Sequence, residues 1–103
     1  MRRRCELRPL AEQDIDLIWE YTEARWGFDQ VRAYTNQIRV AVDRVTAAPE
    51  IGSPQTGPIA HYRKSSVGSH SIFYRFDDST VTIVRILHAR MDASQAAESE
   101  RPQ

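Results

Sequence analysis

The spacing of apolar residues predicts two helices in the first half of the chain. Over residues 9–27, apolar or small side chains recur every three or four positions, as on a single helical face. They are Ala11, Ile15, Ile18, Trp19, Thr22 and Trp26. Gly27 ends this helix, Asp29 is expected to cap the next, and a second apolar stripe follows over residues 31–45. The short connection predicts an antiparallel hairpin, with Trp19 and Trp26 packed in its seam.

The second half of the chain changes to the two-residue alternation of strands. Strands are predicted at 62–66, 70–76 and 80–87, and the short turns between them indicate an antiparallel meander. The strand at 80–87 is apolar on both faces, so it is expected to be central, with segment 4–8 as its other neighbour. Residues 49–60, which are rich in proline and glycine, are predicted to be an irregular connection.

These elements predict an α+β fold of two layers. The order is an N-terminal strand, a helix hairpin and a three-stranded antiparallel meander (β-α-α-β-β-β). Residues 1–92 are expected to form a single domain and residues 93–103 a short tail, mobile or weakly helical. No apolar run approaches membrane-spanning length, and the single cysteine, Cys5, fits a reducing cytoplasm. Cys5 is expected to be buried or half-buried.

Charge is balanced overall but unevenly distributed. The 103 residues carry 14 basic and 14 acidic side chains. Residues 1–10 hold four arginines against one glutamate, and residues 11–50 hold eight acids against four arginines. Residues 61–92 hold five bases against three aspartates. This distribution favours an oppositely charged protein partner over nucleic acid, which requires a strong basic surplus.

The most prominent candidate site is the polar stretch Arg85–Asp92, directly after the apolar strand. Arg63 and Arg75 lie on the two preceding strands, and with Arg85 they are expected to converge on one face, with Lys64 and His88 at its rim. Such a cluster binds phosphates or carboxylates. Three interpretations stay open: structural ion pairs, a partner-binding surface, or stabilisation of charge during RNA cleavage. The ion pairs would be with the acidic helices or with Asp77, Asp78 and Asp92.

No metal or cofactor site is expected. The histidines at 61, 70 and 88 are assigned to three different strands, and no two have the spacing of metal ligands. The glycines lie among prolines and in turns, not in a phosphate-binding loop, and no serine lies in a nucleophile elbow.

An ordered set of short motifs runs through the chain. They are Tyr21-Thr at a helix end, Trp26-Gly27, Tyr34, Ala48-Pro49-Glu-Ile-Gly52, Gly68-x-His-x-Ile-x-Tyr74 and Arg85-Ile-Leu-His-Ala-Arg-Met-Asp92. Together with the order of elements, they resemble the ParE toxins of the RelE/ParE superfamily. The resemblance extends from about Leu7 to Asp92, and the closing octapeptide is its strongest part.

The resemblance implies the toxin of a type II toxin–antitoxin system. Such a toxin stops growth by binding DNA gyrase, and a ParD-like antitoxin neutralises it in a hetero-oligomer; catalysis, a cofactor, direct nucleic-acid binding and a membrane are not expected. Relatives in the RelE branch instead cut mRNA on the ribosome, and on that alternative Arg63, Arg85 and His88 are the expected catalytic residues. The residues expected to contact a partner are Trp26, Phe28, Tyr34, Arg63, Lys64, Arg75, Arg85, His88 and Arg90.

Overall fold

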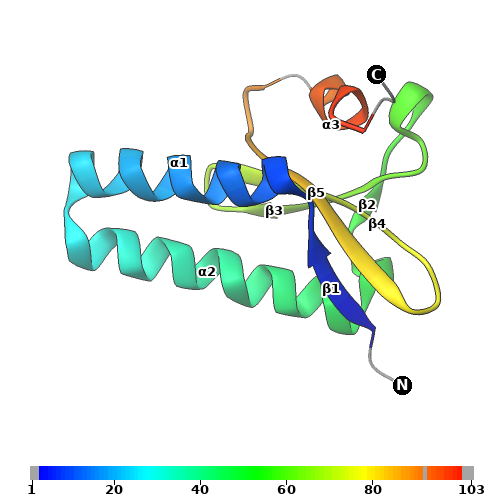
Figure 1. The fold of residues 1–103 in the computed structure, drawn as a ribbon, viewed down its shortest axis with the longest axis horizontal. Helices are drawn as coiled ribbons and strands as arrows, with labels where there is room; N and C mark the ends of the chain where they lie inside the picture. Colours follow the sequence, from blue (N-terminus) through cyan, green and yellow to red (C-terminus); the bar gives the residue numbers. More distant parts are fainter. Residues whose placement is uncertain (1–2, 92, 101–103) are drawn as a thin grey trace.

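Two long helices cover one face of a five-stranded sheet (Figure 1). The computed structural model describes residues 3–91 and 93–100, so Asp92 and the last three residues of the predicted tail lie outside the described part of the chain. The strand order is β1-β5-β4-β3-β2, with β1 (Arg4–Leu7) parallel to β5 (Thr80–His88) and the other neighbours antiparallel. The predicted α+β fold is confirmed.

The predicted meander consists of β3 (Arg63–Val67), β4 (His70–Phe76) and β5. A further strand, β2 (Ser53–Pro54), lies within the connection that was expected to be irregular, where it pairs with β3 at the edge of the sheet. Proline is compatible with this edge position because its missing N–H leaves no gap in an inner ladder. Two short 3₁₀ turns, η1 (Pro49–Ile51) and η2 (Gly57–Ile59), flank β2.

The helix hairpin is confirmed, but its turn differs from the prediction. α1 (Pro9–Trp26) and α2 (Phe28–Ala47) are separated by Gly27 alone, whose φ of 90° favours glycine. Asp29 therefore does not cap α2. It lies in the first turn, where its charge suits the positive end of the helix dipole.

The two tryptophans do not share the hairpin seam, and that prediction is wrong for Trp26. Trp26 is the last residue of α1 and is 64% exposed, because the helix end extends past the region where the hairpin packs on the sheet. Trp19 is half-buried and contacts Phe28 edge-to-face, with ring centroids 6.4 Å apart.

The last strand is central, as predicted, and separates two apolar cores. Under the helices, Val81, Ile83 and Ile86 of β5 pack with residues of α1, α2 and β4; on the other face, Val84 and Leu87 join a second core. A register shift between Phe73 and Tyr74 explains why Ile86, and not Leu87, lies on the helix face. The extra residue in β5 moves the alternation of side chains by one position.

The second core is covered by α3 (Ser94–Glu98), which belongs to the predicted tail. Ala96 is fully buried there against residues that include Tyr62 and Phe73. Cys5 is exposed, contrary to expectation, because β1 is an edge strand with little cover. None of the described helices is long and apolar enough to cross a membrane.

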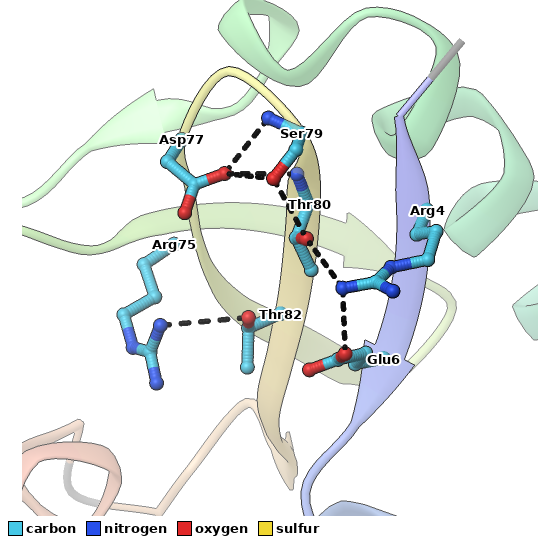
Figure 2. A network of polar contacts seen from close by, with 7 residues as sticks. All are labelled: Arg4, Glu6, Arg75, Asp77, Ser79, Thr80 and Thr82. Atoms are coloured by element: carbon cyan, nitrogen blue, oxygen red, sulfur yellow. Dashed lines mark hydrogen bonds and ion pairs between the residues drawn. The ribbon is translucent and has the colours of Figure 1, made fainter.

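A polar network fixes the turn between β4 and β5 and ties it to β1 (Figure 2). The Asp77 carboxylate accepts hydrogen bonds from the backbone N–H groups of Ser79 and Thr80, at 2.8 and 2.9 Å. These bonds lower the pKa of Asp77, because they favour its charged form. Arg4 of β1 donates to the Thr80 hydroxyl at 3.5 Å and pairs with Glu6. The network sets where β5 begins and how β1 lies beside it.

Candidate functional site

Two adjoining hollows lie between α1 and the end of β5, each of about 340 Å³. They share Tyr21, Thr22, His70 and His88. We call them together the exit groove, because the polar stretch that starts at Arg85 leaves β5 there. Its apolar walls are exposed side chains: Leu17 is 54% exposed, Tyr21 65% and Met91 44%.

The wall of the exit groove between α1 and β5 contains a buried ion pair. Arg85 donates to both carboxylate oxygens of Asp14, from Nε and Nη2, each at 2.8 Å. The same carboxylate accepts the backbone N–H of Ile86 at 2.9 Å. The two side chains are only 16% and 9% exposed, so the pair is largely shielded from water. The bidentate bond favours the charged guanidinium and raises the pKa of Arg85.

A hydrogen-bonded cluster of rings forms the side of the exit groove nearest α2. The Tyr34 hydroxyl is hydrogen-bonded to Nδ1 of His70 and accepts the backbone N–H of Ser69 at 3.1 Å. The His70 ring lies edge-on to His88, with centroids 5.5 Å apart. Burial first, and the neighbouring His88 second, lower the pKa of His70, so its imidazole is neutral near neutral pH.

Gly68 allows this cluster to form. Its φ is +54°, and a Cβ atom there would lie 2.5 Å from the Tyr34 ring. Gly52 has a similar role at the other end of the sheet. Its N–H donates to the Tyr74 hydroxyl at 2.9 Å, and a Cβ would meet that oxygen at 2.1 Å. The motifs around these glycines are therefore explained by close packing on tyrosines.

The predicted convergence of three arginines on one face is wrong. Arg85 is bound to Asp14 beneath α1, whereas Arg75 lies on the opposite face of the sheet, bonded to Glu100 at 2.6 Å. Arg63 is at the far end, where it donates to the backbone carbonyls of Glu50 and Gly52 at 3.1 and 2.7 Å. The pairing of the strands keeps them apart, because Arg75 lies opposite Thr82, three residues before Arg85, and Arg63 lies on β3, beyond β4.

The other predicted contact residues differ in how accessible they are. Trp26 and Phe28 are exposed, at 64% and 56%, whereas Tyr34 is half-buried and its hydroxyl is engaged. His88 and Arg90 are both exposed; His88 lines the exit groove, and the Arg90 backbone N–H donates to its Nδ1 at 3.2 Å. Lys64 is half-buried in β3, opposite Phe73.

Sequence reasoning did not assign several exit-groove residues to a site, among them Asp14, Leu17, Tyr21 and Met91. A signal existed for two of them. Leu17 and Tyr21, with Leu10, form a second apolar stripe on α1 beside the one that packs on the sheet. Apolar side chains left over from the core-facing stripe of a helix are candidates for a contact surface.

Solved structures of other proteins share this fold. The chain has the fold of solved type II toxins: the chromosomal ParDE system from P. aeruginosa matches with a TM-score of 0.73 and 16% identity, over 84% of this chain and 96% of the other. The RelBE2 toxin–antitoxin complex from Mycobacterium tuberculosis matches with a TM-score of 0.65 and 20% identity, over 85% and 99%.

Sequence similarity then defines the family. The protein-family model described as "ParE toxin of type II toxin-antitoxin system, parDE" matches residues 5–93. Toxin ParE1 of Mycobacterium tuberculosis is 41% identical over 96 residues, which cover 92% of this chain and 98% of that protein. Toxin ParE1 of Caulobacter vibrioides is 37% identical over 83 residues, 81% of this chain and 85% of that protein. The chain belongs to the ParE toxin family, within the RelE/ParE superfamily.

Proposed function

We propose that this ParE-family toxin stops growth in the cytoplasm by binding DNA gyrase without breaking a bond, and that a ParD-like antitoxin holds it inactive in a hetero-oligomer. The observation that carries binding over cleavage is the Arg85–Asp14 pair. A nuclease needs free cations to stabilise charge on the scissile phosphate. Here the arginine expected to do so is neutralised by a carboxylate.

The two other residues expected to cleave RNA, Arg63 and His88, are also not free to act on a phosphate in the groove. Arg63 is bound to backbone carbonyls far from the exit groove. His88 is at the groove mouth, but its Nδ1 accepts a backbone hydrogen bond and its ring lies against His70. These contacts favour a surface that recognises a protein.

We further propose that the exit groove receives the antitoxin. Exposed Leu17, Tyr21 and Met91 form an apolar wall, and cationic Arg25 lines the same groove. An amphipathic segment with acidic flanks, which folds on binding, is complementary to such a groove. Domain 1–92 would provide this surface.

The groove is tested by Tyr21→Ala, measured as the affinity of purified toxin for the antitoxin. A central aromatic contact is worth about 2 kcal/mol or more, so we expect at least about a thirtyfold loss. Ile51→Ala is the matched control, because Ile51 is 53% exposed and lies in η1, outside the exit groove. Equal affinities of the two variants would place the antitoxin elsewhere.

The target is tested with purified toxin in two parallel assays. DNA supercoiling by gyrase should fall in proportion to the toxin added, while ribosome-bound mRNA should stay intact. Cleaved mRNA together with normal supercoiling would exclude the gyrase proposal. Growth arrest on expression, relieved by the antitoxin gene, would show that the chain is an active toxin in cells.

The second candidate is a RelE-like ribosome-dependent endonuclease, favoured by the Tyr34–His70–His88 cluster in the exit groove. His88→Gln separates the two functions. Loss of an acid–base residue lowers the rate by about 10²–10⁴-fold, whereas loss of a contact residue weakens binding by about 1–3 kcal/mol. His61→Gln is the control, because His61 is exposed and lies in the turn before β3.

A further inference from the structure

On the sheet face opposite the helix hairpin, three residues far apart in the sequence hold the carboxylate of Glu100, two residues after α3. Arg75 of β4 donates from Nε at 3.0 Å and from Nη2 at 2.6 Å, one bond to each oxygen. The Tyr62 hydroxyl donates to Oε1, and Nε of Arg8 is 3.6 Å from Oε2. The Glu100 side chain is 16% exposed, so it is held in a recess and not on open surface.

Two of the three donors, Tyr62 and Arg75, are also held by contacts other than Glu100. Tyr62 is 1% exposed, and its ring is part of the second core with Phe73. Arg75 is also held by the Thr82 hydroxyl of β5, at 3.4 Å, and Figure 2 shows the two side chains next to each other. Burial and the Glu100 carboxylate raise the pKa of Tyr62, which therefore stays a hydrogen-bond donor. The recess is preorganised for an anion.

The segment that fills the recess packs on the second core through small side chains. α3 has five residues, and the side chains that it and its preceding residue pack on the second core are alanines: Ala93, Ala96 and Ala97. An alanine buries little apolar area, so this packing contributes less than that of larger side chains. The Arg75–Glu100 bond favours the charged carboxylate and lowers the pKa of Glu100. The Glu100 carboxylate is therefore a main tie between the tail and the sheet.

We propose that Arg8, Tyr62 and Arg75 form a carboxylate-binding site, which Glu100 fills in the free protein and which an acidic side chain of a protein partner occupies when α3 lifts. The occupant in the structure is itself a carboxylate, bound by the planar fork of an arginine. Asp77 lies near enough to act on Arg75, and the chain has no net charge, so a phosphate backbone gains little long-range attraction here. The inference rests on the proposed function in one respect, that an antitoxin is the partner. It does not require that gyrase is the target.

The test uses the full chain and a fluorescein-labelled hexaglutamate peptide, with binding followed by anisotropy. Glu100→Gln removes the internal competitor, and we expect the peptide to bind about tenfold more tightly than to the unsubstituted protein, the effect of one charge-assisted hydrogen bond. Glu98→Gln is the matched control, because Glu98 is exposed and this substitution removes the same charge from the same tail. Adding Arg75→Gln to Glu100→Gln should abolish the gain, whereas adding Arg44→Gln, at an exposed arginine of α2, should not.

Hydrogen exchange provides a second measurement that does not need the peptide. In Glu100→Gln the amides of α3 should exchange faster, while those of β5 stay protected, which also shows that the variant is folded. Equal peptide affinities of Glu100→Gln and Glu98→Gln would overturn the proposal. Tighter binding of inorganic phosphate or a single-stranded oligonucleotide than of the peptide by Glu100→Gln would also overturn it, because the recess would then be a phosphate site. These outcomes are independent of the supercoiling assay.

Discussion

The buried Asp14–Arg85 pair gives the sharpest prediction, through the substitution Asp14→Ala. It leaves the guanidinium, 16% exposed, without its carboxylate, and it leaves the Ile86 N–H without its acceptor. Breaking a buried ion pair by removing one partner costs about 3–5 kcal/mol. Because domains are stable by only about 5–15 kcal/mol, the variant should be severely destabilised.

The assay is urea unfolding followed by circular dichroism. With a slope of about 1–3 kcal/mol per molar urea, the midpoint should fall by about 2 M. Asp16→Ala is the matched control, because Asp16 is an exposed carboxylate on the same helix and should change stability by only about 0.5 kcal/mol. If both variants unfold at the same urea concentration, the pair is not the anchor that its geometry indicates.

A double substitution checks the physical reason. Asp14→Leu with Arg85→Met replaces both charges with apolar groups, and such replacements of buried pairs are often neutral or stabilising. The double variant should therefore be more stable than Asp14→Ala. Either side chain without its partner destabilises the fold, because a buried charge and its polar groups are then paired neither with protein nor with water.

Two further substitutions test the other clusters. Tyr74→Phe removes the hydroxyl that donates to the Pro49 carbonyl at 2.6 Å and accepts the Gly52 N–H, so urea unfolding should show a loss of about 1–3 kcal/mol. His70→Gln tests the pH dependence: because its pKa is lowered in the folded protein, the unfolded chain binds a proton first, and stability should fall as the pH drops below about 6.5. His70→Gln should flatten that decline.

Each of these has a control. Tyr21→Phe removes an exposed hydroxyl and should leave the unfolding midpoint unchanged, so an equal loss in both tyrosine variants would contradict the role of Tyr74. For the pH profile, exposed His61→Gln should keep the decline. Tyr34, His88 and Asp14 also face His70, and a decline that survives His70→Gln would contradict its assignment to this histidine.

The motifs that resembled ParE toxins are largely structural in this fold. Gly52 and Tyr74 bind one another, Gly68 makes room for Tyr34, and Arg85 is held by Asp14. Their presence identifies the fold and the family more directly than it identifies the target. The exposed Leu17 and Tyr21, outside the packed stripe of α1, are better placed to meet a partner.

Local periodicity in the sequence was enough to predict the helix hairpin, the meander and the central position of β5, because burial on one or both faces imposes a repeat on the chain itself. The partners of the arginines could not be predicted in this way. Asp14 and Arg85 are 71 residues apart, and one extra residue in β5 determines which face its last side chains occupy. Only the tertiary structure decided that Arg85 is neutralised beneath α1 and that Arg75 lies on the other face, because side-chain pairing depends on register and distance in space.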